Sequence, residues 1–335
     1  MEKHKIILDV DTGMGLPVCD IDDGIAIALA LASPEIELLG CTTCGGNVRT
    51  HESTINTLRI LEMAGRGDIP VAEGREDPFI QDVSASFEWL EARSESARHF
   101  WYDNMPPLKD PTISPSPLKA HEFIIEMIKK HPGKVTIVKE GSLTNLALAL
   151  LVEPEIAPLV KGVVHMGGHM GPMSWDGGPP VIPRHLWRDL LRMNTEFDPH
   201  ATVIVIRSGI PFTFVDGVSG KTFLRPEHLD RIGAVGTPWH DFLEYTSRPW
   251  VEWWSMGQAG REGACMWDPF TLAVVFDPSF CRFVNVRFDA DRFLAWEYPY
   301  VYASPDSPQV RFSVEPVDVE RFENMMVERL ASPLP

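Results

Sequence analysis

The feature that most constrains the fold is an alternation of short apolar runs with segments of helical periodicity. Apolar runs occupy residues 5–10, 36–43 and 69–74, and helical patterns occupy 21–32 and 51–65 between them. This order is typical of parallel strands joined by helical crossovers. The sequence therefore predicts an α/β fold with an open, mostly parallel sheet, a Rossmann-like core and helices on both faces.

The alternation resumes after residue 117. Further segments are predicted as helix 117–133, strand 134–141, helix 142–154, strand 161–168, helix 198–209 and strand 210–217. Stretches 75–117 and 167–190 break the rhythm with aromatic, Pro and Gly residues, so we expect irregular loops there. Ligands of such sheets bind beyond the carboxyl ends of the strands, where we expect the active site. Because no linker divides the chain, we expect a single domain over residues 1–335.

Charge and composition exclude several classes of function. The chain has 47 acidic and 30 basic residues and a formal net charge of −17, which is unfavourable for nucleic-acid binding. The N-terminal "MEKHKIILDV" lacks a cleavable hydrophobic segment, and no apolar run approaches the roughly 20 residues that span a bilayer. Five scattered cysteines predict reduced, buried thiols. We therefore expect a cytoplasmic protein that acts on a small molecule, without a nucleic-acid or membrane partner.

Aspartates crowd around the end of the first predicted strand. They are Asp9, Asp11, Asp20, Asp22 and Asp23. Asp11 falls at the strand end, whereas Asp22 and Asp23 begin the next helix, whose dipole favours negative charge. Helix capping accounts for Asp20 alone. Since crowded carboxylates repel one another, the group predicts a divalent cation, Ca²⁺ in preference to Mg²⁺.

Six segments resemble, in the same order, motifs of the nucleoside hydrolases, the calcium-dependent N-ribohydrolases. The first, "ILDVDTG…DIDDGIAIALAL", resembles the family signature of Asp-x-Asp-x-Gly followed by Asp-Asp and an apolar helix. The others are "LLGCTTCGGN", "VTIVKEGSLTNLALAL", "VVHMGG", "MNTEFDPHA" and "CMWDPF". The resemblance implies a homodimeric or homotetrameric enzyme that hydrolyses the N-glycosidic bond of a ribonucleoside.

The same resemblance implies roles at the metal site. Asp11 is expected to bind Ca²⁺ and to take a proton from the attacking water. Asp23, Asp268 and the backbone carbonyl of Glu140 are expected to complete the calcium ligands. This agrees with the chemistry, because a carboxylate beside an activated water can finish its deprotonation while an oxocarbenium-like sugar forms.

Substrate contacts follow from the resemblance as well. Asp22, Asn47 and Asn194 are expected to bind the ribose. Trp267 stands where some members carry a histidine acid, which is similar to the purine-preferring branch. We therefore expect Trp267 to stack on a purine base, with Trp89, in preference to Trp101, on the other side. Core packing is the alternative for each ring.

Three departures from the family pattern leave questions open. The insertion "MGLPVCDI" before Asp22 is expected to bulge or to cover the site, with Asp20 as an extra polar contact. Arg192 replaces an acidic residue and is either a surface arginine or a contact for an acidic or phosphorylated 5′ substituent. Glu140 replaces a small residue, which matters little if only its carbonyl binds the metal.

Three other functions are compatible with parts of this pattern. One is a non-catalytic nucleoside- or sugar-binding protein, which needs no base such as Asp11. Another is a hydrolase of modified or 5′-phosphorylated ribonucleosides. A phosphatase of the haloacid-dehalogenase type needs a separate Lys and a later acidic pair. His165, His169 and His240 are candidate proton donors, with structural roles as the alternative.

Overall fold

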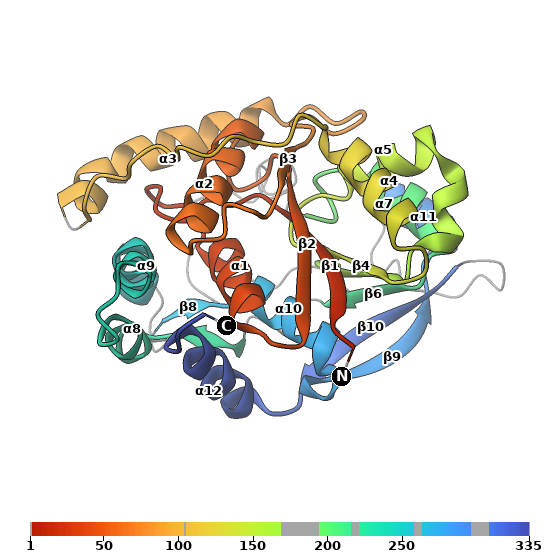
Figure 1. Cartoon of the computed structure of the whole chain (residues 1–335). Coiled ribbons are helices and arrows are strands. Elements are labelled where there is room, and N and C mark those ends of the chain that lie inside the picture. The colour runs from red at the N-terminus through yellow and green to blue at the C-terminus, as the bar shows by residue number, and fades with distance from the viewer. Residues whose placement is uncertain are drawn as a thin grey trace.

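The computed structural model of the chain describes residues 2–103, 105–168, 194–215, 221–257, 263–295 and 308–334. The strands of its main sheet are His4–Val10 (β1), Ile36–Thr43 (β2), Val71–Glu73 (β3), Val135–Lys139 (β4), Gly162–Met166 (β5), Phe212–Val215 (β6), Cys281–Arg287 (β9) and Gln309–Pro316 (β10). They lie in the order β3-β2-β1-β4-β5-β6-β10-β9 (Figure 1). Neighbours are parallel except for β9 and β10, so the predicted mostly parallel sheet is confirmed.

Helices cover both faces of this sheet, as predicted (Figure 1). One hydrophobic core includes α1 (Asp22–Ala32), α2 (Thr50–Met63), α8 (Pro226–Gly233), α9 (Pro238–Gly257), α10 (Trp267–Phe276) and α12 (Val319–Leu330). The core on the opposite face includes α4 (Ala120–Lys130), α5 (Thr144–Val152), α7 (Pro199–Arg207) and α11 (Ala290–Leu294). A separate antiparallel pair, β7 (Phe223–Leu224) and β8 (Ala264–Cys265), lies beside α8 and α9.

The centre of the molecule is built from β1 and α1. Residues Ile6–Val10 of β1 are all buried, as expected for a parallel strand covered on both faces. In α1 every residue except Ala32 is buried, because this helix is apolar all round and packs between the sheet and other helices. Its packing against α10 places the beginnings of the two helices side by side.

The strand order reverses between β1 and β4. The chain passes from β1 to β2 on one side, whereas β4 leads to β5 on the other. Loops that leave such a switch point diverge, and the crevice between them is the usual ligand site of open α/β sheets. Asp11 follows β1 and Glu140 follows β4, so both lie at this point.

The expectation of an irregular loop over 75–117 was wrong in part. The 20-residue helix α3 (Ser84–Asp103) lies within that stretch. Only Ser86, Phe87 and Trp101 of this helix are buried, so its sequence lacks the apolar stripe that reveals most helices. Trp89 therefore lies on a helix. Most of the second irregular stretch, 167–190, falls outside the described residues.

Two expectations about the whole chain can be checked directly. All five cysteines are free and buried, as predicted. Within the described ranges, no helix combines the length and apolarity that a membrane span requires.

Candidate active site

Asp11 and Asn47 form the part of the site that lies between β1 and β2. The backbone N–H of Asn47 donates to Asp11 Oδ2 at 2.9 Å, and its side-chain amide donates to Asp11 Oδ1 at 3.2 Å. The same amide lies 3.3 Å from Asp23 Oδ2. Gly46 permits this close approach, because a Cβ at that position would overlap the Asp11 carboxylate.

Three carboxylates converge from the beginnings of α1 and α10. One oxygen from each of Asp22, Asp23 and Asp268 lies within 4.8 Å of the others, and all three residues are buried. The backbone N–H of Asp268 donates to Asp22 Oδ2 at 3.4 Å. The backbone N–H of Asp11 donates to Asp23 Oδ1 at 3.0 Å, which connects this triad to the end of β1.

Glu140 adds a further buried carboxylate. Its backbone N–H donates to the carbonyl of Asp9 at 2.8 Å, so the end of β4 is held against β1. Its side chain is only 1% exposed, and neither carboxylate oxygen has a hydrogen-bond partner in the described part of the chain. Asp268 Oδ1 is buried and without a partner in the same way.

Burial dominates the acidity of these groups. It raises the pKa of Asp11 to about 6, although hydrogen bonds from Asn47 and Asp23 act in the opposite direction. The pKa values of Asp22, Asp23, Asp268 and Glu140 are raised well above the ordinary range, first by burial and then by neighbouring negative charges. No lysine or arginine of the described ranges forms an ion pair with any of these five carboxyl groups.

These oxygens suit a hard divalent cation. Calcium takes six to eight oxygen ligands, mainly from carboxylates and carbonyls, and magnesium also prefers oxygen. The unpartnered oxygen of Asp268 and the converging triad provide such donors. The grouping differs in one respect from the expected ligand set, because Asp22 replaces Asp11 in the triad while Asp11 is hydrogen-bonded to Asn47.

Of the expected ribose-binding asparagines, Asn47 is the one that bonds to this cluster, and Asn194 lies at the end of another strand. Asn47 is half-buried beside Asp11 and Asp23. Asn194 adopts a left-handed backbone conformation with φ of 40°, and its side-chain amide donates to the carbonyl of Met166 at 3.2 Å. Asn194 is therefore held at the end of β5. Arg192, the expected 5′-side contact, lies outside the described residues.

A row of aromatic rings leads away from Asp268. Trp267 is half-buried at the beginning of α10, and its ring meets that of Trp254 edge-on at 5.9 Å. Trp253 follows at 6.5 Å from Trp254. The guanidinium of Arg93 lies 4.8 Å from the ring of Trp253 and 5.2 Å from that of Trp89. One side of the Trp89 ring is thus covered by the Arg93 guanidinium. Arg93 and Trp89 both lie on α3, and the contact of Arg93 with Trp253 connects α3 to α9.

The insertion before α1 is buried for most of its length. A Cβ on Gly24 of α1 would overlap the Met14 side chain, so the insertion packs directly on this helix. Asp20 Oδ1 accepts from the backbone N–H groups of Ile21 and Asp22, at 2.8 and 3.4 Å. Asp20 thus supports the beginning of α1 from the position before the N-cap, which is Ile21, so it is not the helix cap considered from the sequence.

The sequence interpretation missed a polar network beneath the site. Asp9 is fully buried and forms an ion pair with the equally buried Lys139. The same carboxylate accepts from Thr42 at 2.7 Å and from the side-chain amide of Asn145 at 3.1 Å. Asp9 is aligned with Thr42 on β2 and with Lys139 on β4. A lysine at the end of an otherwise apolar strand is the signal that could have revealed the pair.

The two described histidine candidates have structural partners. His165 contacts the carbonyl of Lys139 through Nδ1 at 3.2 Å and the hydroxyl of Thr195 through Nε2 at 2.9 Å. Burial lowers the pKa of His165 to about 3, so it is a neutral imidazole. His240 contacts the carbonyl of Ser332 at 3.2 Å. His169 lies outside the described residues.

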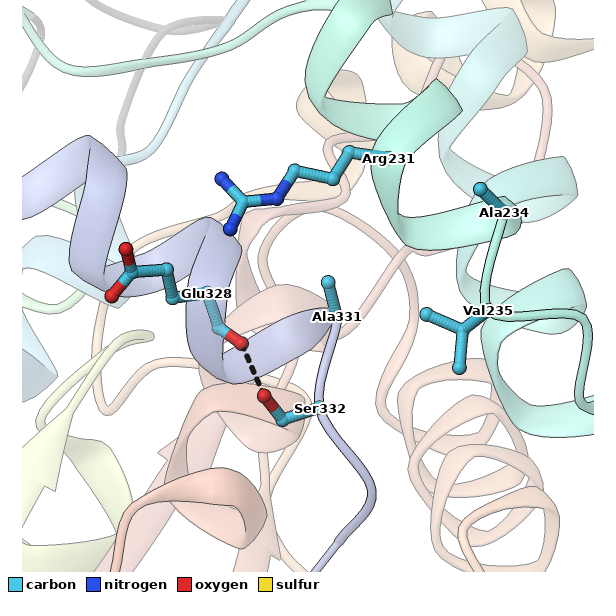
Figure 2. Close-up of a pocket in the computed structure, with 6 residues that line it drawn as sticks. All are labelled: Arg231, Ala234, Val235, Glu328, Ala331 and Ser332. Atoms are coloured by element: carbon cyan, nitrogen blue, oxygen red, sulfur yellow. Dashed lines mark hydrogen bonds between the residues drawn. The ribbon is translucent and has the colours of Figure 1, made fainter.

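A cavity of about 500 Å³ lies elsewhere, between α8 and the end of α12 (Figure 2). Its lining residues are Arg231, Ala234, Val235, Glu328, Ala331 and Ser332. In Figure 2 the hydroxyl of Ser332, two residues past the end of α12, donates to the carbonyl of Glu328 in that helix. None of these residues belongs to the carboxylate cluster, so this cavity contributes nothing to the candidate site.

Comparisons with known proteins agree with the geometry. The family model described as "Inosine-uridine preferring nucleoside hydrolase" matches residues 6–324. A pyrimidine-specific ribonucleoside hydrolase, RihA, from Citrobacter koseri is 31% identical over 329 residues, which cover 95% of this chain and 99% of the relative.

Solved structures show the same relationship. A purine-preferring ribonucleoside hydrolase from Gardnerella vaginalis superposes with a TM-score of 0.75 at 26% identity, covering 98% of each chain. A plant nucleoside hydrolase, PpNRh1, gives a TM-score of 0.71 at 26% identity, covering 98% of this chain and 99% of the other. The chain therefore belongs to the nucleoside hydrolase family, whose members hydrolyse the N-glycosidic bonds of ribonucleosides.

Proposed function

We propose that this protein is a Ca²⁺-dependent ribonucleoside hydrolase that prefers purine bases and uses Asp11 as its general base. The observation that carries the proposal is the convergence of Asp22, Asp23 and Asp268 beside Asp11, without a pairing lysine or arginine in the described ranges. Buried charges that the chain leaves unpaired need an external cation. The family is metal-dependent, which supports this assignment.

The donors for the cation are the carboxylates of Asp11, Asp23 and Asp268 and the carbonyl of Glu140, with Asp22 beside them. A bound divalent cation supplies positive charge that makes water more acidic and attracts hydroxyl oxygens. The chain itself then supplies the proton acceptor. Asn47 holds both oxygens of the Asp11 carboxylate, so the acceptor is oriented before the substrate arrives.

Ribose binding is assigned to Asp22, Asn47 and Asn194. A carboxylate accepts hydrogen bonds from sugar hydroxyls, and amide groups can donate to them or accept from them. As the N-glycosidic bond breaks, the sugar becomes oxocarbenium-like, and the surrounding carboxylates stabilise its positive charge. The site thus combines orientation of the ribose with electrostatic stabilisation of the transition state.

The preference for purines rests on Trp267. Its ring is half-buried next to Asp268 and braced by Trp254, so it is a fixed surface for a flat base. A bicyclic base gains more contact on an indole than a pyrimidine does. Overall similarity does not decide this point, since the Citrobacter relative is named pyrimidine-specific and the Gardnerella structure purine-preferring.

A chromatographic assay tests the proposal. Inosine, guanosine, adenosine, uridine and cytidine, and their 5′-monophosphates, are incubated with the protein and Ca²⁺, and free base and ribose are quantified. We expect free purine bases from unphosphorylated nucleosides. Faster release from 5′-monophosphates would favour the phosphorylated substrates considered from the sequence, and faster release from uridine would remove the purine preference. Binding without release of base would identify a non-catalytic binding protein.

A further inference from the structure

Glu140 is the one carboxylate of the cluster whose side chain has no assigned role. Within the cation site proposed above, only its backbone carbonyl is used. Yet the residue is 1% exposed, and both carboxylate oxygens are buried without a hydrogen-bond partner in the described part of the chain. Buried carboxylates are nearly always hydrogen-bonded or paired, so a side chain with both oxygens unsatisfied needs a separate explanation.

The neighbouring lysine does not supply that explanation. Lys139 forms its ion pair with Asp9, with which it is aligned across β1 and β4. Successive side chains of a strand point to opposite faces, and this alternation, carried one residue past the end of β4, directs Glu140 away from the side that holds this pair. The opposite face is the one covered by α1 and α10, which carry Asp23 and Asp268.

The Glu140 carboxylate is not one of the three that converge within 4.8 Å, which are those of Asp22, Asp23 and Asp268, but its charge interacts with the same group. Negative charges on Asp23, Asp11 and Asp9 act on it, and its own charge acts on Asp268. All of these neighbours except Asp9 belong to the proposed cation site. A further negative charge among them is unfavourable in the protein alone and becomes favourable when a cation is present.

We propose that the side-chain carboxylate of Glu140 belongs to the cation site as a fifth anionic group, beside Asp11, Asp22, Asp23 and Asp268. This inference rests on the proposed function, because it concerns the same cation. Its consequence is specific to this chain: the added charge strengthens cation binding and opposes folding of the metal-free protein.

Calorimetric titration of the full chain with Ca²⁺ tests the proposal. Glu140→Gln keeps the size of the side chain and removes its charge, and it should weaken Ca²⁺ binding by roughly 10- to 100-fold. Glu323→Gln is the matched control, since Glu323 is a buried glutamate paired with Arg225. The control should bind Ca²⁺ as the parent does. An affinity of Glu140→Gln within twofold of the parent overturns the proposal.

The melting temperature in the presence of a chelator is the second readout. Metal-free Glu140→Gln, and Glu140→Met as a second neutral variant, should melt at or above the temperature of the metal-free parent, because repulsion is removed. If both variants melt lower, Glu140 supports the fold through packing, and the proposal is wrong even if affinity falls. If the parent protein binds no Ca²⁺, both the proposed cation site and the role of Glu140 are wrong. If the parent binds Ca²⁺ and Glu140→Gln binds it equally well, only the role of Glu140 is wrong.

Discussion

The buried carboxylates near the end of β1 form two groups, the first of which is Asp9 alone, and the chain treats them in opposite ways. Asp9 is paired with Lys139 and receives hydrogen bonds from Thr42 and Asn145. The second group is formed by Asp11, Asp22, Asp23, Asp268 and Glu140, none of which pairs with a lysine or arginine in the described ranges. Both groups are almost completely buried.

The charge of Asp9 is structural, whereas the charges of the second group are those that we assign to the function. The hydrogen-bond and ion-pair partners of Asp9 come from β2, β4 and α5. Since Asp9 itself lies on β1, its carboxylate connects three strands and a helix in the interior of the protein. The chain thus supplies its own cation where the negative charge serves the fold. Where carboxylates converge without one, we propose that an external cation supplies the missing positive charge.

The largest expected effect comes from the second group. Asp11→Asn should lower kcat by about 10²- to 10⁴-fold, because the amide cannot accept the proton of the attacking water. Substrate binding should remain, and it can be measured by calorimetry with the inactive variant. A kcat within a few-fold of the parent would remove Asp11 from the role of base.

The next prediction is that substitutions in the two groups change the free energy of unfolding in opposite directions. Lys139→Met leaves the Asp9 carboxylate buried without a counter-charge and should lower the free energy of unfolding by about 3–5 kcal/mol. Asp23→Asn should instead raise the stability of the metal-free protein, because it reduces repulsion in the second group. Urea unfolding in the presence of a chelator measures both. Equal destabilisation by the two variants would mean that the groups do not differ.

A smaller effect is expected from the residue that we assign to stack on the nucleobase. Trp267→Ala should slow hydrolysis of inosine or guanosine by roughly 5- to 150-fold, since stacking on one base contributes about 1–3 kcal/mol. Nitrophenyl riboside is the control substrate, because its leaving group departs without needing a proton. Equal losses on both kinds of substrate would show that Trp267 only packs the site.

The smallest effect concerns pH. The carboxyl groups of the second group have raised pKa values in the folded protein, about 6 for Asp11. These groups therefore contribute most to the stability of the metal-free protein below pH 4, where they are protonated, and this contribution is lost as the pH rises through 6 and above. Ca²⁺ offsets the repulsion between the ionised carboxylates. The rise in melting temperature caused by Ca²⁺ should therefore be small at pH 4.5 and larger at pH 7.5. A rise that is equal at both pH values would contradict this.

The sequence predicted the parts of the site that depend on local patterns. Asp11 at a strand end and Asp22–Asp23 at a helix beginning follow from hydrophobic periodicity, and the structure places them together. Asp268 is 245 residues from Asp23, so only resemblance to a family brought it into the site. In the structure, α1 and α10 bring one oxygen from each of these two carboxylates within 4.8 Å of each other.

Other features could not be read from the sequence. The pairing of Asp9 with Lys139 depends on the register between β1 and β4, which the order of residues does not specify. The helix α3 was missed because its exposed polar residues hide the helical period. Glu140 was considered only for its carbonyl, since an unsatisfied side chain is recognised only when its surroundings are known.

The central claim is that hydrolysis of ribonucleosides by this protein depends on a divalent cation held by the second group. The most direct measurement is release of ribose from inosine by protein treated with a chelator, followed by titration with Ca²⁺. We predict no release without the cation and saturable recovery, with a midpoint that matches the Ca²⁺ affinity from calorimetry. Undiminished release by chelator-treated protein that calorimetry shows to be free of cation would contradict the account.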